Sequence, residues 1–239
     1  MAYFEDALKD VVGSYTDSGS YSTVTETYTD DTLNAIFSAA INDVTSVIPD
    51  DLLLKECTPT DLGADGAITT TAVDKRVLQV TRRDANSKQI VCEEINHREA
   101  AFVDNTGSYS NRTHANNKVF PVYWIDLADH HIHVRPALTG NNNAADSGEA
   151  YLLTQHVNTD LSTQVEAIGG VPTFANMAII YKTAMGIIQL RLADAVEEDE
   201  DGEMQNLLNS QLNSLKEAFE NEISSISGIG RERMKTGGA

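Results

Sequence analysis

The amino-acid sequence predicts an α+β fold, in which a helical body carries an inserted antiparallel β region. Apolar residues recur with a helical period early in the chain (33–47) and again late in it (173–226). Between residues 77 and 157 the period falls to two, which is typical of strands. The order helix, strands, helices favours α+β over an alternating α/β arrangement. The helical body then consists of one early helix and a late helical hairpin.

The late hairpin, residues 171–226, is the most strongly patterned stretch. Pro172 suits the first turn of a helix, where its missing N–H costs nothing. The first arm is apolar on most of its surface, which predicts a buried helix, with Ile179 on its far side. The second arm, after Gly202, has one apolar face and one Asn, Gln, Glu and Lys face, so it is predicted to be amphipathic. The predicted stripe of the first arm is Phe174, Met177, Tyr181, Met185, Ile188, Leu192 and Ala195; that of the second is Met204, Leu208, Leu212, Leu215, Phe219, Ile223 and Ile226.

The N-terminal part combines two helical patterns with a polar stretch. Residues 2–12 predict a short helix, and residues 13–31 are rich in Ser, Thr, Tyr, Gly and Asp without a period. That stretch is either a disordered connector or an arm that orders on a neighbouring subunit. Asp30, Asp31 and Thr32 offer N-cap chemistry for a helix over 33–47, which Ile48–Pro49 ends.

The β region is predicted from alternating segments separated by polar loops. Strands at 77–81 and 89–96 form one hairpin, and strands at 119–126 and 131–135 form a second. Further strands are expected at 97–103 and 149–157, and loops at 57–72, 104–118 and 139–148. The predicted organisation is an N-terminal helix and polar arm (1–28), a helical body (29–56 and 171–227), a β-rich insertion with long loops (57–170) and a flexible, locally basic tail (228–239).

The charge balance restricts the partners. The chain has 239 residues, a net charge of −19 and a pI near 4.5, which disfavours nucleic-acid wrapping and binding to anionic membranes. The N-terminus lacks a basic signal region, and Lys182 and Arg191 interrupt the longest apolar segment, so we expect no membrane span. Two cysteines without a CxxC motif, Cys57 and Cys92, are expected to be buried, free thiols in a reducing compartment.

The best metal-ligand candidate lies at the start of the second predicted hairpin's return strand. On a strand, Asp129, His131 and His133 point the same way, so that they converge on one ion. The competing interpretation is a polar sheet face or subunit contact, because metal ligands usually come from separate elements. The other histidines, His97, His114 and His156, are scattered singles.

No other stretch carries a catalytic signature. The acidic run 194–203 fails the calcium-loop test, because Leu208 stands where the bidentate glutamate is required. A solvated helix–helix turn explains it, and a site assembled between subunits stays open. There is no GxSxG, GxxxxGK[ST] or GxGxxG motif. Cys92 lies five residues from His97, but this spacing alone is weak evidence for a catalytic pair. We therefore assign no catalytic, cofactor-binding or metal residue and expect that the protein is not an enzyme.

Three segments in order carry a resemblance to a known family. They are LNAIFSAAINDVTSVIPDDLLL (33–54), FPVYWIDLADHHIHVRPAL (120–138) and VPTFANMAIIYKTAMGIIQLRLADA (171–195). Together they resemble the neck proteins of tailed bacteriophages, the head-to-tail adaptor or connector beneath the portal. The resemblance covers roughly residues 30–225 and does not include the N-terminal arm.

This resemblance implies a virion structural protein that forms a homo-oligomeric ring between portal and tail. The ring is expected to have twelve copies, with six as the alternative, and its partners are the portal protein and a tail or tail-tube protein. The implied location is the virion neck, and the host cytoplasm during assembly, with no cofactor and no membrane. An acidic channel would let DNA slide through without specific binding.

Three alternatives remain open at this point. One is a metal-dependent enzyme that uses Asp129, His131 and His133. A second is another virion ring protein, such as a tail terminator. The third is a small binding module that stays monomeric in solution.

Overall fold

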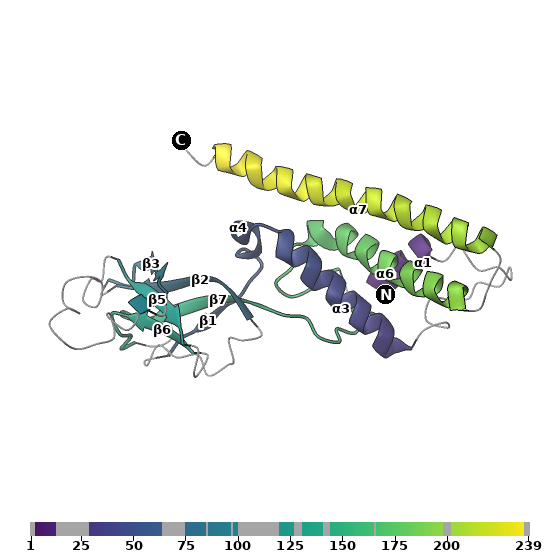
Figure 1. Cartoon of the computed structure of the whole chain (residues 1–239). Helices are drawn as coiled ribbons and strands as arrows, with labels where there is room; N and C mark the ends of the chain where they lie inside the picture. The colour runs from purple at the N-terminus through teal and green to yellow at the C-terminus, as the bar shows by residue number, and fades with distance from the viewer. Residues whose placement is uncertain are drawn as a thin grey trace. The chain divides into compact units, whose positions relative to one another are not determined.

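The chain is an α+β protein, as the sequence predicts (Figure 1). The computed structural model describes residues 3–12, 29–63, 75–84, 86–96, 98–99, 120–126, 131–140, 144–164, 166–197 and 202–236; the side chains of residues 197, 227 and 229–236 are not described. The chain divides into two compact units, residues 1–56 with 156–239 (the helical unit) and residues 57–155 (the β unit). Residues 156–170, which the sequence prediction placed in the insertion, therefore belong to the helical unit. The predicted polar arm lies outside the described residues.

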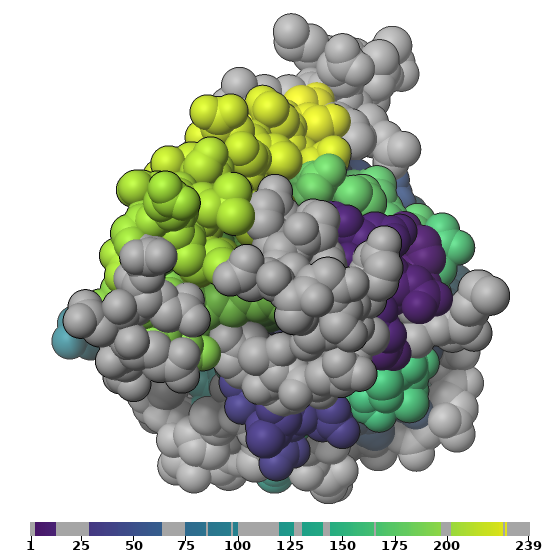
Figure 2. Space-filling model, turned by 90° about the vertical axis from the view of Figure 1, so that its right-hand side faces the viewer, coloured from purple at the N-terminus to yellow at the C-terminus, as the bar shows by residue number. Residues whose placement is uncertain are grey.

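The helical unit is built around one central helix. Its elements are α1 (Tyr3–Val12), α3 (Asp30–Val47), α4 (Asp50–Leu53), the 3₁₀ turn η2 (Thr173–Ala175), α6 (Asn176–Glu197) and α7 (Gly202–Thr236). Helix α6 packs against α1, α3 and α7, and it forms the predicted helical hairpin with α7 (Figure 1). Figure 2 looks onto the end of this unit where α3 and α7 begin, and α1, in purple, reaches the surface there.

Both ends of α3 follow from local sequence. The cap is Thr29, whose side chain accepts a hydrogen bond from the Thr32 amide at 3.4 Å. The sequence prediction placed the cap one to three residues later, at 30–32. The helix ends at Ile48, which adopts an extended conformation because the following Pro49 disfavours helical backbone before it.

The buried face of α6 differs from the predicted stripe. Phe174 and Met177, which head that stripe, are 39% and 36% exposed, whereas Ile179, predicted on the far side, is fully buried. The reason is that α6 is contacted by helices on several sides, so no single stripe defines its interior. By contrast, α7 packs mainly against α6, with a hydrogen bond from Gln211 to Val11 of α1, and members of its predicted face, Leu208, Leu215 and Ile226, are buried.

Helix α7 is longer than predicted. Its backbone remains helical through Thr236, where the sequence predicts a loose tail from residue 228. At 35 residues it exceeds α6, which has 22, by 13 residues. At 1.5 Å per residue the difference corresponds to about 20 Å of helix.

The closest approach between α3 and α6 is made possible by a glycine. A Cβ atom at Gly186 would lie 2.6 Å from Ile36 Cγ2, whereas a Cβ at Gly228 in α7 would meet nothing within 4 Å. We expect Gly228→Ala to stabilise the protein by about 0.5–1 kcal/mol through helix propensity. Gly186→Ala is expected to be about 2 kcal/mol less stable than Gly228→Ala, because Ile36 must shift. Urea unfolding followed by circular dichroism measures both, and equal stability of the two variants would contradict the close approach.

The β unit contains two sheets. Strands β1 (Pro59–Asp61), β7 (Gly148–Thr154), β2 (Lys75–Arg83) and β3 (Gln89–Val91) form an antiparallel sheet in that order. Strands β4 (Glu93–Glu94), β5 (Val122–Ile125) and β6 (Ile132–Arg135) form the second sheet, in which β4 and β5 are parallel. Both predicted hairpins, β2–β3 and β5–β6, are present, as is the predicted strand β7.

Two predictions for the β unit are wrong. Strand β1 lies in a stretch predicted to be a loop, and all three of its residues are exposed. Residues 98–99 are helical where a strand over 97–103 was predicted; the rest of that range lies outside the described residues. The helical turn is explained by reciprocal capping, since the Glu99 amide donates to Asn96 Oδ1 (3.0 Å) and the Asn96 amide donates to Glu99 Oε2 (3.3 Å).

One segment of the chain joins the two sheets. The Cys92 amide donates to the Val80 carbonyl of β2 at 2.8 Å, and three residues later the Ile95 amide donates to the Tyr123 carbonyl of β5 at 2.9 Å. The two sheets therefore share a core, which comprises Leu62, Val80, Cys92, Tyr123, Ile132, Val134, Leu138 and Ala150. Cys57 and Cys92 are buried, as predicted, and neither forms a disulfide within the described residues.

Candidate functional site

The predicted histidine pair lies on β6 and its N-terminal edge. The rings of His131 and His133 are 6.5 Å apart, centroid to centroid. Asp129, the third member of the predicted metal site, lies outside the described residues. Within the described part of the chain, no group of three or more His, Cys, Asp or Glu side chains is placed to hold a metal ion.

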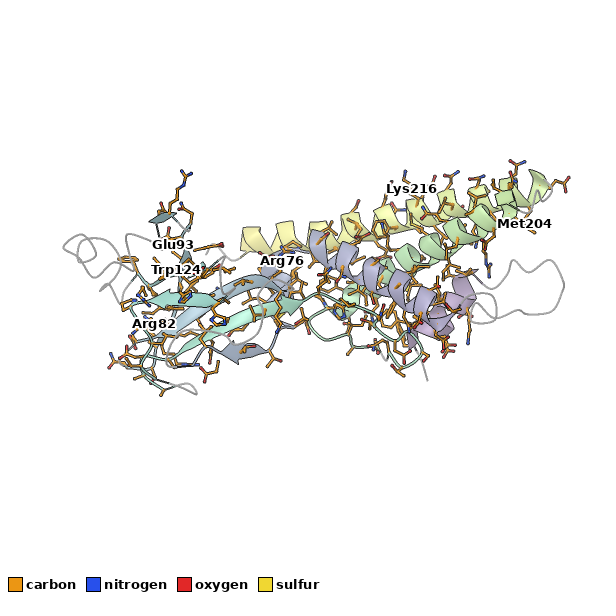
Figure 3. The ribbon with its side chains drawn as sticks, turned by 60° about the horizontal axis from the view of Figure 1, so that its bottom comes forward. Arg76, Arg82, Glu93, Trp124, Met204 and Lys216 are labelled. Carbon is orange, nitrogen blue, oxygen red and sulfur yellow. The ribbon has the colours of Figure 1, made fainter. Side chains whose placement is uncertain are left out.

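His133 belongs to a row of stacked side chains on the sheet face that points away from the β-unit core. Trp124 and His133 are directly opposed in the β5–β6 pairing, and their rings stack at 5.3 Å with 16° between planes. The Arg135 guanidinium lies 5.5 Å from the centre of the same indole, which Figure 3 labels. Cross-strand stacking and cation–π attraction account for this arrangement, so packing explains the position of His133 without a ligand.

The other single candidates are described only in part. Burial raises the pKa of Cys92 to about 12, against a lowering by Arg82, so the group is a thiol and not a nucleophilic thiolate at neutral pH. Its sequence neighbour His97, like His114, lies outside the described residues. Burial lowers the pKa of His156, whose Nδ1 lies 3.3 Å from Thr159 Oγ1.

The acidic residues of the helical unit form no described ligand site. Residues 198–201 of the predicted acidic turn lie outside the described residues. Glu5, Asp30 and Asp160 contribute to the lining of a hollow of about 20 Å³, which has room for about one water molecule. The side chain and amide of Ser162 hydrogen-bond to Asp160 and lower the pKa of its carboxyl group.

The first turns of α7 present an unusual surface for so acidic a protein. Residues 204–215 contain no charged side chain, although 22% of the whole chain is charged. Met204 is the first residue of this run, and Lys216 follows its last residue; both are labelled in Figure 3. Its exposed residues, which we call the α7 face, are Asn206, Leu207, Asn209, Ser210, Asn213 and Ser214.

The α7 face also includes exposed apolar surface. Leu207 is 46% exposed, and Leu207, Ser210 and Ser214 follow one another at helical spacing along one stripe. Gln205 Nε2 donates to the Ala195 carbonyl at 3.4 Å, which places the end of α6 beside the start of α7. Next to Ala195, Val196 is 59% exposed. An uncharged surface with exposed Leu and Val side chains is suited to packing against another protein surface.

The polar composition of the outer side of α7 was predicted from the sequence, but its lack of charge over residues 204–215 was not. The signal that reveals the α7 face is the twelve-residue run without Asp, Glu, Lys or Arg. It becomes informative only once the exposed members of the run are known.

Comparisons with known proteins add no assignment. No protein-family model, curated protein or solved structure matches this chain. In the described residues, no helix combines the length and apolar character needed to cross a membrane.

Proposed function

We propose that this chain is a virion structural protein of a tailed phage, a head-to-tail adaptor that forms a homo-oligomeric ring between portal and tail. The proposal starts from the resemblance of residues 33–54, 120–138 and 171–195 to phage neck proteins. Those residues contribute α3 and α4, the β5–β6 hairpin, and most of α6. A tail terminator or other virion ring protein is a close variant of this function.

The observation that carries the proposal is the uncharged α7 face on a chain with a net charge of −19. Two copies of such a chain repel each other unless they meet through surfaces that bear little charge. A basic partner would instead choose the acidic surface, because the α7 face offers no carboxylate. A nucleic acid would be repelled by the acidic surface and would find no cation on the α7 face. The α7 face therefore suits a neighbouring copy of the same chain.

A closed ring requires two different patches that meet head to tail. In this proposal the α7 face is one of the two patches. The acidic balance of the chain would make the channel non-adhesive for DNA. Carboxylates that line a lumen repel phosphates, so that DNA passes without being held.

The metal-dependent enzyme has no observation in its favour. His133 is packed on Trp124, and the described residues hold no metal-ligand group.

The test is the native mass of the purified protein by light scattering, followed by negative-stain imaging with and without portal rings. We expect rings of six or twelve copies, either alone or on the portal. A monomer that does not bind the portal would overturn the proposal. Bound metal in the same sample, measured by elemental analysis, would then favour the enzyme.

A further inference from the structure

A short segment after the β unit lies along α3 and is held by side chains of that helix. Asn34, Ser38 and Asn42 are spaced by four residues, so they form one stripe on α3. They bind the backbone of residues 156–161, which we call the strap.

Four hydrogen bonds hold the strap. Asn42 makes two with His156: its Nδ2 donates to the carbonyl (2.8 Å), and its Oδ1 accepts from the amide (2.9 Å). The Thr159 amide donates to Ser38 Oγ at 2.7 Å, and the Leu161 amide donates to Asn34 Oδ1 at 2.9 Å. On the strap side, all four bonds are made by backbone atoms. Two of the bonds are at His156, one is at Thr159 and one is at Leu161.

Little apolar burial supports these bonds. Val157 is 74% exposed, and Asn158 adopts a left-handed conformation with φ of 49°. Leu161, at the C-terminal end, is 4% exposed and is the only strap residue in the described core. The strap is thus anchored at its end and held before it by polar contacts, which also include a hydrogen bond between His156 and the backbone of Gly169.

The other connection between the units is secured differently. The chain leaves the helical unit after α4, where Leu52 and Leu53 are 3% and 0% exposed. Buried leucines anchor this exit by the hydrophobic effect, which is larger per residue than a hydrogen bond exchanged with water. The segment that leaves the helical unit after α4 is consequently harder to detach from that unit than the strap, through which the chain returns.

We expect the free energies of the bound and the detached strap to be close to each other. A hydrogen bond that replaces one with water contributes little net stability, and four such bonds must offset the ordering of several backbone residues. Segments of this kind, with few apolar contacts, open locally without unfolding the rest of the protein.

We propose that the strap is a releasable connection that detaches from α3 as one unit, up to the anchor at Leu161. Release adds residues 156–160 to the chain that returns from the β unit, an extra reach of about 17 Å. The β unit gains freedom to adjust to a binding partner while α3 and α6 stay folded. This inference is independent of the proposed ring.

Hydrogen exchange of the full-length protein, read at single amides by NMR, tests the release. The amides of His156 and Thr159, which lie before the anchor, are expected to exchange at least about 100-fold faster than core amides of α6, and at similar rates to each other. The Leu161 amide, at the anchor, should exchange more slowly than both. Asn42→Ala, which removes two bonds, is expected to speed exchange at His156 and Thr159 by about tenfold. Ser46→Ala, on the same helix, removes a hydroxyl that bonds only to the Asp43 carbonyl in the described residues, and should leave them unchanged.

A second measurement follows the consequence for the β unit. Spin labels at Gln189→Cys in α6 and Val91→Cys in β3 report the distance between the units, and the native cysteines are buried. Asn42→Ala is expected to broaden the distance distribution, whereas Ser46→Ala is not. Strap amides that exchange only as slowly as the α6 core, or equal distributions in both variants, would overturn the proposal.

Discussion

The substitution Ser210→Glu is expected to abolish the self-association that we propose for this chain. Ser210 lies in the exposed, uncharged α7 face, and the added carboxylate would meet a neighbour that already carries a charge of −19. Placing like charges across an interface costs several kcal/mol, which corresponds to at least about a hundredfold weaker contact. Light scattering at matched protein concentration should report the monomer mass in place of the assembled mass.

The matched control is Ser46→Glu. It adds the same charge at an exposed serine of α3, so the net charge of the two variants is equal. We expect Ser46→Glu to assemble like the native protein. If both variants assemble, α7 is not the contact between copies; if both are monomeric, net charge alone controls assembly.

Asp146→Asn is expected to lower the free energy of unfolding of the β unit by about 3 kcal/mol, because it leaves a buried charge without its partner. Arg82, labelled in Figure 3, is 1% exposed, and its Nη2 donates to Asp146 Oδ1 at 2.7 Å. The remaining guanidinium donors go to neutral carbonyls, those of Pro136 and Arg83, both at 3.2 Å. Asparagine tolerates the left-handed backbone of position 146 (φ 60°), so the substitution isolates the charge.

Urea unfolding followed by tryptophan fluorescence measures this effect, since Trp124 is the single tryptophan and lies in the β unit. Glu93→Gln, an exposed charge removal on β4, is the control and should change stability by less than about 0.5 kcal/mol. The double variant Arg82→Met/Asp146→Asn should regain most of the loss, because it removes the isolated charge. Equal stability of Asp146→Asn and Glu93→Gln would show that the ion pair contributes nothing.

Much of the fold is predictable because its signals are local. The α3 helix has apolar spacing and a proline stop, and the two β hairpins have alternating residues around short polar turns. These features require no knowledge of the rest of the chain. Strand β1 was missed because three exposed residues have no inward-facing pattern, and β7, with which it pairs, is about ninety residues away in sequence.

Other features depend on contacts that the sequence does not display. The interior of α6 is defined by several helices, so its predicted stripe placed Phe174 inside and Ile179 outside. The stripe Asn34, Ser38 and Asn42 is visible as polar residues at helical spacing, but its partner is backbone, which has no sequence signal. Similarly, the stacking of His133 on Trp124 follows from the register of β5 with β6.

The candidate surface on α7 has a clear sequence signature that the sequence analysis did not use. An amphipathic helix predicts which side faces solvent, and the charge-free run over 204–215 lies in the same helix. Exposure of Leu207 then distinguishes a contact surface from an ordinary solvated one. By contrast, the metal-site prediction relied on strand alternation, which places His131 and His133 on one side but supplies no ligand from another element.

Because the helical unit is assembled from both ends of the chain, its halves are synthesised far apart in time. At roughly ten residues per second, about 15 seconds separate the end of α3 from the end of α6 on the ribosome. An isolated helix of 18 residues is marginal in water. Phe37 can already meet Phe4 of α1, which is synthesised earlier, but the side of α3 that packs on α6 stays uncovered during this interval. The β unit, encoded between them, is complete before α6 emerges. The nascent α3 segment therefore exposes apolar surface that a chaperone can bind until α6 is made.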